Sequence, residues 1–564
     1  MGAIMRNILI VEAVSTGYNL INDVIKRGYY PVVLSVRDAS GVYTTHRKIY
    51  DKYRTKAIFI DEQEDYEKTL ELARSFDPVL VVPGAEGGVA LATMLADDLG
   101  LPGNPKSILP QMTRKDKMHE ALKNAGIRYI RGKEVTTPEE ALEFCNSLGI
   151  KTAVVKPLQS AGSNGLYLCD SLEDVEKAVT EILKLEDFYG RPIGSALVQE
   201  RIVGTEYIVN TATCNGDHKL NSILRYKKHK TPEGGYIYDY CETIGRLEPG
   251  HAAMVEYAFK VADAIGIRYG LVHGEYMIDE KGPVLIEVNC RAMGGTMAAE
   301  FLDKVFGQHE TDTLLDCFLY PEKFKEDKLK PYRPMRKGVL KFLIVPTDTD
   351  VENHPIWEVG KQLKSTFDIA AGDVNQYAYY AKTRDLETSG GVIYLLHDDE
   401  SVVKADLELL RNIEKNYFQL LLNDGMSRRW LKADEDPEFS FDKIIEEFGC
   451  KGSILIASDS VTGIEHVCSV TPDTVSQVTA GFDNVIIGYQ NSLIPLTESQ
   501  CLKLLFKTLS LVRPKGRVLI PENTWKYLSY NRSGAEQVLL IKNFVIEPPL
   551  PEHPGMIIGT YESI

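Results

Sequence analysis

Residues 273–291 form the segment that most constrains how this chain can fold: His-Gly-Glu-Tyr-Met-Ile-Asp-Glu-Lys-Gly-Pro-Val-Leu-Ile-Glu-Val-Asn-Cys-Arg. Two β-rich runs flank residues 280–282, and Gly282 can adopt the positive φ that a tight reversal requires. The segment therefore predicts a β-hairpin with its turn at these three residues. In that register Glu275 lies directly opposite Glu287.

The same register places His273 opposite Asn289. Because side chains alternate along a strand, Glu287, Asn289 and Arg291 share one face of the second strand. Opposed carboxylates repel each other unless a cation lies between them, and two carboxylates with an amide oxygen suit Mg²⁺ or Mn²⁺. Arg291 would then lie beside the metal, where an anion can bind. Taken alone, such a glutamate pair is more often a solvated hairpin edge, so the metal site depends on the residues upstream.

The net charge of −16 over 564 residues excludes a general binder of nucleic acid or anionic membranes, but it leaves room for a local phosphate-binding pocket. The length predicts several domains. Nine scattered cysteines without a CxxC pair favour reduced thiols over disulfides or a zinc site. No apolar run is as long as a membrane span, and the run within Met1–Glu12 is too short for a secretory signal. We expect a cytoplasmic protein that acts on small molecules.

The first hundred residues alternate between strand-like and helix-like runs, which predicts a small parallel α/β domain. The runs are a strand at Asn7–Val11, a helix at Ser15–Lys26, and strands at Tyr30–Val36 and Pro78–Pro83. The last strand ends in Gly-Ala-Glu-Gly-Gly, and ligands favour this end of a parallel sheet. Because that sequence does not spell GxGxxG, we expect a substrate edge with Glu86 as its ionised group.

Lys156 ends a β-rich run and precedes the loop Gln-Ser-Ala-Gly-Ser-Asn-Gly at residues 159–165. This is not the phosphate loop GxxxxGK[ST], because the lysine precedes the glycines and no Lys-Ser/Thr pair opens a helix after them. The N–H groups of Gly162, Ser163 and Gly165 can still fold over a triphosphate. A purely structural glycine hairpin is an equal alternative for the loop taken alone.

In their order along the chain, these features resemble the ATP-grasp superfamily over roughly residues 1–430. Residues 285–291, Leu-Ile-Glu-Val-Asn-Cys-Arg, with Glu275 upstream, resemble the ligase signature hEhNxR. Thr-Arg-Lys-Asp-Lys-Met at 113–118 is similar to the segment that opens the ATP-binding fold, and Val-Val-Lys-Pro with Gly-Ser-Asn-Gly is similar to its phosphate-covering loop. The resemblance implies an α/β ATP-grasp fold, in which an N-terminal parallel α/β domain precedes two α+β subdomains that clamp ATP.

The resemblance also implies the site residues. Two lysines would neutralise the phosphates, with Lys115 as their solvated neighbour, while backbone atoms near residues 200–202 would bind the adenine edge and Glu206 would accept from the ribose hydroxyls. The implied ATP-binding residues are Lys117, Lys156, Gly162, Ser163, Gly165, Gln199, Glu200, Ile202 and Glu206. Two Mg²⁺ or Mn²⁺ ions would be held by Glu275, Glu287 and Asn289.

The chemistry of the superfamily supplies the expected reaction. A carboxylate attacks the γ-phosphate, ADP leaves, and an amine displaces phosphate from the acyl phosphate. Arg291 would stabilise the acyl phosphate and the oxyanion, or pair with the carboxylates as well. His273 could assist proton transfer or serve only as a packing and hydrogen-bonding residue. The chain resembles the amino acid ligases that make dipeptides, in which Glu86 would hold a substrate ammonium and Gly294 and Gly295 would leave room for a carboxylate.

Two other functions stay open. An ATP-grasp carboxylase of the biotin carboxylase type would use the same ATP site, but the sequence has no biotin-acceptor Met-Lys-Met. A catalytically silent ATP-binding regulator is disfavoured because the metal and phosphate residues are intact. The expected partners are amino acid substrates, with no nucleic acid and no membrane, and related ligases are often dimers, which leaves a homodimer open.

The last part of the chain exceeds what this ligase family needs. Phe482–Ile487 and Leu511–Ile520 resemble later strands of Rossmann-like methyltransferases, but the opening strand at Ser453–Ser460 lacks the GxGxG turn for cofactor binding. We therefore expect a degenerate, non-methylating Rossmann-like domain. The expected division is an N-terminal domain at 1–105, the small ATP-grasp subdomain region at 106–197, the large subdomain with the metal site at 198–330, the C-terminal part of the ligase at 331–430, and the accessory domain at 440–564.

Overall fold

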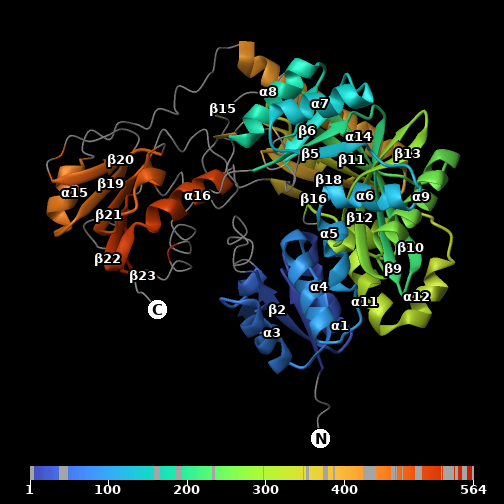
Figure 1. Cartoon of the computed structure of the whole chain (residues 1–564), viewed down its shortest axis with the longest axis horizontal. Coiled ribbons are helices and arrows are strands. Elements are labelled where there is room, and N and C mark those ends of the chain that lie inside the picture. The colour runs from blue at the N-terminus through green and yellow to red at the C-terminus, as the bar shows by residue number, and fades with distance from the viewer. Residues whose placement is uncertain are drawn as a thin grey trace, which may run out of the picture. The chain divides into compact units, whose positions relative to one another are not determined.

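The computed structural model of the chain divides into two compact units (Figure 1). The first comprises Met1–Ile344, Pro355–Ala370 and Arg384–Glu414, and the second comprises Val345–His354, Ala371–Thr383 and Lys415–Ile564. The five-part division expected from the sequence is finer and stays a prediction. The structure describes residues 6–36, 49–157, 166–184, 194–231, 236–295, 297–346, 349–350, 355–371, 379–380, 382–384, 386, 388–423, 440–458, 464, 466–472, 474–489, 498–521, 524, 539, 544–548 and 556–561.

A four-stranded parallel sheet in the order β3-β2-β1-β4 opens the first unit. The sequence predicts its parallel character and three of its strands, whereas β3 adds a fourth strand that it does not predict. Its strands are β1 (Asn7–Val11), β2 (Tyr30–Ser35), β3 (Ile58–Asp61) and β4 (Pro78–Pro83). The strands are almost wholly apolar because helices cover both faces: α3 (Tyr66–Ser75) and α4 (Val89–Asp98) pack on one face and α1 (Asn19–Lys26) on the other.

A second, antiparallel sheet has the strand order β5-β8-β6-β7 and carries Lys156 on β6. Two amphipathic helices, α7 (Pro138–Leu148) and α8 (Leu172–Leu183), bury their apolar faces against it. Gly162, Ser163 and Gly165 follow β6 but lie outside the described residues. The strands are β5 (Gly132–Val135), β6 (Ala153–Pro157), β7 (Tyr167–Cys169) and β8 (Ala196–Glu200).

The largest sheet has eight strands in the order β13-β12-β9-β10-β11-β14-β18-β16. The strands are β9 (Thr205–Cys214), β10 (Asp217–Lys230), β11 (Tyr236–Thr243), β12 (Tyr269–Asp279), β13 (Gly282–Asn289), β14 (Lys337–Phe342), β16 (Thr366–Ala371) and β18 (Gly391–His397). The helices of this region are α5 (Leu109–Thr113), α6 (Lys115–Asn124), α9 (Pro249–Ile265), α10 (Ala299–Phe306), α11 (Glu310–Leu319), α12 (Pro321–Lys328), α13 (Pro355–Gln362) and α14 (Glu400–Asn423).

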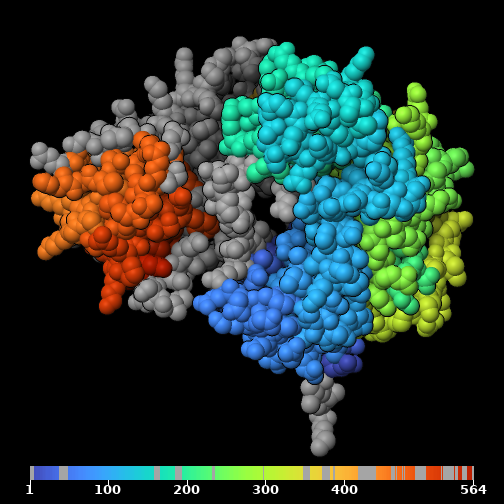
Figure 2. Space-filling view, in the orientation of Figure 1, coloured from blue at the N-terminus to red at the C-terminus, as the bar shows by residue number. Residues whose placement is uncertain are grey.

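One hydrophobic core joins the N-terminal sheet to the large sheet within the first unit. Ile8 and Leu80 belong to the same buried cluster as Leu271 of β12 and Leu314 of α11. Figure 2 shows the result, since the blue N-terminal residues and the green to yellow residues of this unit form a continuous surface. The carboxyl end of β4 is therefore fixed next to the start of β12.

The second unit contains a six-stranded sheet in the order β20-β19-β21-β22-β24-β23. The first four of these strands are parallel, whereas β24 is antiparallel to both β22 and β23. The two strand runs singled out in the sequence become the parallel neighbours β21 and β22. The degenerate methyltransferase assignment stays a prediction. The elements are α15 (Phe441–Glu447), β19 (Ile454–Ser458), β20 (Val467–Val470), β21 (Phe482–Gly488), α16 (Glu498–Leu509), β22 (Val512–Ile520), β23 (Phe544–Ile546) and β24 (Ile557–Tyr561), with the two-stranded pair β15 (Thr349–Asp350) and β17 (Tyr379–Tyr380).

Among the described residues, no helix combines the length and the apolar character needed to cross a membrane.

Candidate active site

The predicted hairpin is formed by β12 and β13, and it brings the two glutamates together. Glu275 pairs with Glu287, and His273 pairs with Asn289, which confirms the predicted register at this end of the hairpin. The side chains of Glu275 and Glu287 are 18% and 19% exposed. Two half-buried carboxylates thus face each other across neighbouring strands.

The turn of the hairpin differs from the prediction. Asp279 pairs with Gly282, so the loop contains only Glu280 and Lys281. A β-bulge at Ile286 then inserts one unpaired residue into β13, which restores the predicted register beyond it. Gly282 has φ +97, as the reversal requires. Without the bulge, Glu287 would be shifted out of line with Glu275.

Lys115 belongs to this site, so the expectation that it is a solvated neighbour is wrong. Its Nζ lies 2.9 Å from Glu287 Oε2, and its side chain is largely buried. Burial lowers the pKa of Lys115, but Glu287, Glu86 and Glu275 outweigh that effect and raise it. Its ammonium is therefore charged beside the two opposed carboxylates.

The structure does not bring Lys117 to this cluster, and its phosphate-binding role stays a prediction. Its Nζ lies 2.7 Å from Glu120 Oε2 on an exposed part of α6. Residues two positions apart in a helix point in directions about 200° apart, because one turn takes 3.6 residues. Lys115 and Lys117 therefore cannot both face the carboxylates.

Lys156 reaches the site from β6. The residue is 5% exposed, and within the described part of the chain its ammonium has no hydrogen-bond or ion-pair partner. Burial lowers the pKa of Lys156 to about 8, and nearby Lys115 acts in the same direction, whereas Glu287 and Glu275 oppose the change. A buried cation without a partner is costly, so this position suits a group that binds an anion.

Lys228 is a further lysine of the site that the sequence analysis missed. Its Nζ lies 2.6 Å from Glu206 Oε1 and within 4.7 and 4.4 Å of the ring centroids of Tyr226 and Tyr238. Burial lowers the pKa of Lys228, but Glu206, Tyr238 and Glu275 outweigh it and raise the value. Burial raises the pKa of Glu206, which was expected to bind ribose. Strand alternation places Tyr226 and Lys228 on one face, and that pattern could have identified the lysine.

His273 is buried behind Glu275. Its Nδ1 lies 2.8 Å from Asn210 Oδ1, and its Nε2 lies 3.7 Å from Glu275 Oε1. Burial would raise the pKa of Glu275, but His273, Lys228 and Lys115 lower it to about 2. Glu275 is therefore ionised at neutral pH, as a metal ligand must be.

Arg291 extends the site towards the N-terminal domain. Its Nε lies 3.1 Å from Glu86 Oε2, so the two residues expected to bind substrate charges form an ion pair. Glu86 reaches this position because the ends of β1 and β4 are closely packed, and a Cβ at Gly84 would collide with the carbonyl of Glu12.

Gly294 and Gly295 follow Arg291, and the space beside each α-carbon is open, with no heavy atom of the described residues within 4 Å of a Cβ built there. Gly295 has φ +82, a conformation that favours glycine. The structure therefore agrees with the expectation that these glycines leave room beside Arg291.

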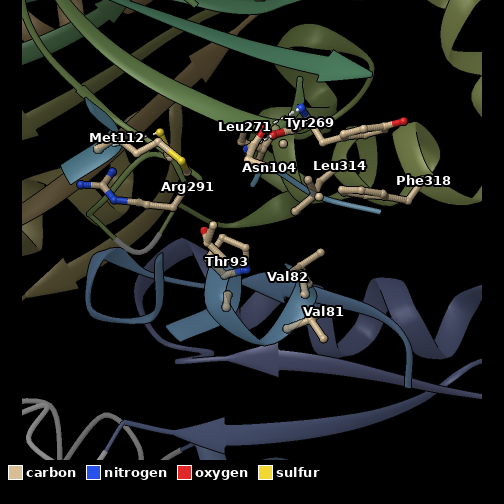
Figure 3. Close-up of a pocket in the computed structure, with 16 residues that line it drawn as sticks. Val81, Val82, Thr93, Asn104, Met112, Tyr269, Leu271, Arg291, Leu314 and Phe318 are labelled. Atoms are coloured by element: carbon tan, nitrogen blue, oxygen red, sulfur yellow. Dashed lines mark hydrogen bonds between the residues drawn. The ribbon is translucent and has the colours of Figure 1, made fainter. Parts of the chain in front are cut away.

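A small cavity of about 40 Å³ begins at Arg291 and continues between the N-terminal sheet and the large sheet (Figure 3). Val81, Val82 and Thr93 line one side, and Tyr269 lies at the far end with Phe318. The lining is mostly apolar, with Arg291 as its charged residue.

The expected adenine side of the site is at the end of β8. Arg131 Nη2 lies 2.6 Å from Glu200 Oε2, and the N–H of Glu200 donates to the Arg131 carbonyl. Burial raises the pKa of Glu200, but the Arg131 hydrogen bonds outweigh it and lower the value. Gln199 is buried and Ile202 is half-buried. The Glu200 side chain and N–H are thus occupied, and adenine binding by this segment stays a prediction.

Comparison with known proteins adds independent information. A family model described as the ATP-grasp domain matches residues 150–300. Dapdiamide A synthase from Enterobacter agglomerans is 26% identical over 423 residues, which cover 74% of this chain and 98% of the relative. Alanine–anticapsin ligase from Bacillus subtilis (strain 168) is 24% identical over 308 residues, covering 47% of this chain and 64% of the relative. The crystal structure of an L-amino acid ligase from Bacillus licheniformis superposes with a TM-score of 0.55 at 18% identity, covering 72% of this chain and 97% of that one.

Proposed function

We propose, from the premise that this chain is an ATP-grasp ligase that forms carbon–nitrogen bonds, that it joins an amino acid or a similar carboxylate to an amine or a second amino acid. The observation that carries the proposal is the grouping of charges from two sheets and helix α6. Glu275 and Glu287 lie opposite each other. Lys115, Lys156 and Lys228 each interact electrostatically with at least one of these carboxylates.

The donor set fits Mg²⁺ or Mn²⁺. Glu275, Glu287 and Asn289 would hold the metal through carboxylate and amide oxygens, which are the ligands that hard cations prefer. The ionised state of Glu275 and the direct opposition of the two carboxylates support this assignment. When bound, the metal would neutralise phosphate charge.

The lysines fit the phosphates of ATP. Lys156 has no partner within the described residues, and the ammonium of Lys228 lies over two tyrosine rings. A carboxylate oxygen of the substrate attacks the γ-phosphorus, and the bond to ADP breaks. The cations stabilise the charge on the oxygens of the transferred group, so they serve the transition state as well as binding.

Arg291 serves the second half of the reaction. An amine attacks the acyl carbon, negative charge develops on the acyl oxygen, and phosphate leaves as the amide forms. The guanidinium can stabilise that oxyanion because Arg291 follows the metal ligands on the same strand end. For His273, the hydrogen bond to Asn210 and the 3.7 Å approach to Glu275 support a role in orienting that carboxylate.

A zwitterion fits the substrate end of the site. Glu86 can accept from an ammonium group, and Arg291 can bind a carboxylate, while Gly294 and Gly295 leave space between the chain and the ligand. The name of the alanine–anticapsin ligase states that this relative joins alanine, which supports an amino acid as one substrate here.

The test is a screen of amino acid pairs with ATP and Mg²⁺, in which phosphate release is measured and products are identified by mass spectrometry. We expect at least one pair to give ADP, phosphate and the corresponding amide. Absence of turnover for all pairs, in a protein that still binds ATP, would contradict the proposal, as would formation of AMP and pyrophosphate. Release of ADP that depends on bicarbonate and needs no amine would favour a carboxylase instead.

A further inference from the structure

Residues 291–295 and Met297, which follow β13, are held at several points along their backbone. The N–H of Arg291 donates to the Asn289 carbonyl at 2.9 Å, and the N–H of Met293 donates to Glu310 Oε2 at 2.7 Å. At its other end, the N–H of Met297 donates to Thr16 Oγ1 at 2.8 Å. Gly294 and Gly295 lie between the contacts of Met293 and Met297. Because glycine has wide conformational freedom, these contacts restrict the backbone of residues 293–295.

Glu310 is an unusual residue to accept the hydrogen bond from the Met293 N–H. It is 3% exposed, and its second oxygen, Oε1, is buried and has no hydrogen-bond partner among the described residues. Burial raises the pKa of Glu310, while the Met293 N–H, His273 and Arg291 act in the opposite direction. An incompletely paired buried carboxylate costs free energy that a neutral acceptor would avoid, so its position demands an explanation beyond stability.

The start of α11 holds Glu310 in place. His309 Nε2 lies 2.9 Å from Asp23 Oδ2 and its Nδ1 lies 2.7 Å from Asp303 Oδ1. On the other side of Glu310, Thr311 Oγ1 donates to Asp23 Oδ2 at 2.7 Å. Both neighbours of Glu310 in the sequence are thus tied to α1, which leaves its carboxylate little freedom to move.

We propose that Glu310 is a positioning residue for the ligase reaction, and that its carboxylate fixes the Met293 N–H so that Arg291 and the glycine pair stand in register with the acyl phosphate. This inference rests on the proposed function. Glu310 acts from behind the segment, through the backbone, and touches no substrate. A shift of the segment by about 1 Å would misplace Arg291 relative to the developing oxyanion, and misplacements of that size can cost about a hundredfold in rate.

The test separates position from charge with two substitutions. Glu310→Asp keeps the charge but withdraws the carboxylate by one methylene, and Glu310→Gln keeps an acceptor oxygen at the same distance without the charge. We expect Glu310→Asp to lower kcat by about 10- to 100-fold while the Kd for ATP changes less than about threefold. Glu310→Gln should stay within about threefold of wild-type kcat. Glu322→Gln, an exposed position on α12, is the matched control.

Hydrogen exchange gives a readout that needs no turnover. In Glu310→Asp, amides of the peptide that contains residues 291–297 should exchange faster, while β12 and β13 keep their protection. The inference is overturned if folded Glu310→Asp keeps wild-type kcat and exchange, or if the aspartate and glutamine variants lose equal activity. If the wild-type protein forms no amide, the proposed function is wrong. If hydrogen exchange is unchanged in Glu310→Asp, the positioning role is wrong, whatever the activity.

Discussion

Two buried lysines of the first unit, Lys156 and Lys341, differ in what surrounds their charges. Lys341 Nζ on β14 lies 2.9 Å from both Asp239 Oδ1 and Glu414 Oε2. Lys156 Nζ on β6 has no such partner in the described part of the chain, and burial lowers its pKa to about 8. Both are on strands and both are almost fully buried. Asp239 and Glu414 neutralise Lys341, whereas no described residue pairs with Lys156, which under the proposed function binds phosphate.

The same contrast holds for the groups around each lysine. Asp239 also accepts from Arg411 and His229, each at 3.0 Å, so the Lys341 network is closed. In the candidate active site, Glu275 and Glu287 oppose each other. Lys115 pairs with Glu287, whereas Lys156 has no close partner among the described residues. A closed network stabilises the fold, while an open one has charge available for Mg²⁺ and phosphate. Substitutions should therefore separate stability from ligand binding.

The largest effect should come from opening the closed network. Lys341→Met leaves Asp239 and Glu414 buried without their shared cation, and we expect the free energy of unfolding to fall by about 3–5 kcal/mol. Denaturant unfolding measures this loss. A decrease below about 1 kcal/mol would show that the network does not stabilise the first unit.

Glu287→Gln acts on the open cluster, where we expect a loss of function without loss of fold. The substitution removes one carboxylate of the proposed metal site and an ion-pair partner of Lys115. Turnover should fall by about 1000-fold or more, which corresponds to about 4 kcal/mol of transition-state stabilisation. The unfolding free energy should change by less than about 1 kcal/mol. Steady-state kinetics check this, with Glu300→Gln on the exposed face of α10 as the control.

Lys156→Met is the direct counterpart of Lys341→Met. Because the ammonium is buried without a partner among the described residues, its removal should leave stability unchanged or raise it. The affinity for ATP should fall by about 10- to 100-fold, which titration calorimetry can measure. If this variant instead unfolds as readily as Lys341→Met, the distinction between the two lysines is wrong.

A second buried network, around His309, should make stability depend on pH. Burial lowers the pKa of His309, but hydrogen bonds to Asp23 and Asp303 raise it to about 9. The folded value exceeds the unfolded value of about 6.5, so the stabilisation is complete below pH 6.5 and is lost as the pH rises through 9. Between these limits the unfolding free energy should fall by about 3 kcal/mol. His309→Gln should flatten that dependence, and an identical slope in both proteins would contradict the assignment.

The hairpin register could be predicted because alternation and Gly282 together decide which side chains face each other. The bulge at Ile286 could not, since a two-residue loop with a bulge and a three-residue loop give the same pairing of Glu275 with Glu287. Only the twist of the neighbouring strands selects between them.

The positively charged residues were harder to predict than the carboxylates. Lys115 and Lys117 flank Asp116, so the sequence does not distinguish them. The packing of α6 decides which one faces Glu287. Lys228 lay in a strongly basic run, where alternation with Tyr226 was the available signal. No sequence pattern identified Glu310, because its contact with Met293 depends on the path that the chain takes through α10.

The formation of an acyl phosphate is the central claim, and transfer of ¹⁸O tests it most directly. The carboxylate substrate found in the amino acid screen is labelled in both oxygens and converted with ATP, Mg²⁺ and the amine. The account predicts that each amide formed is accompanied by one inorganic phosphate that carries one ¹⁸O atom, with unlabelled ADP. Unlabelled phosphate, or label in AMP, would contradict it.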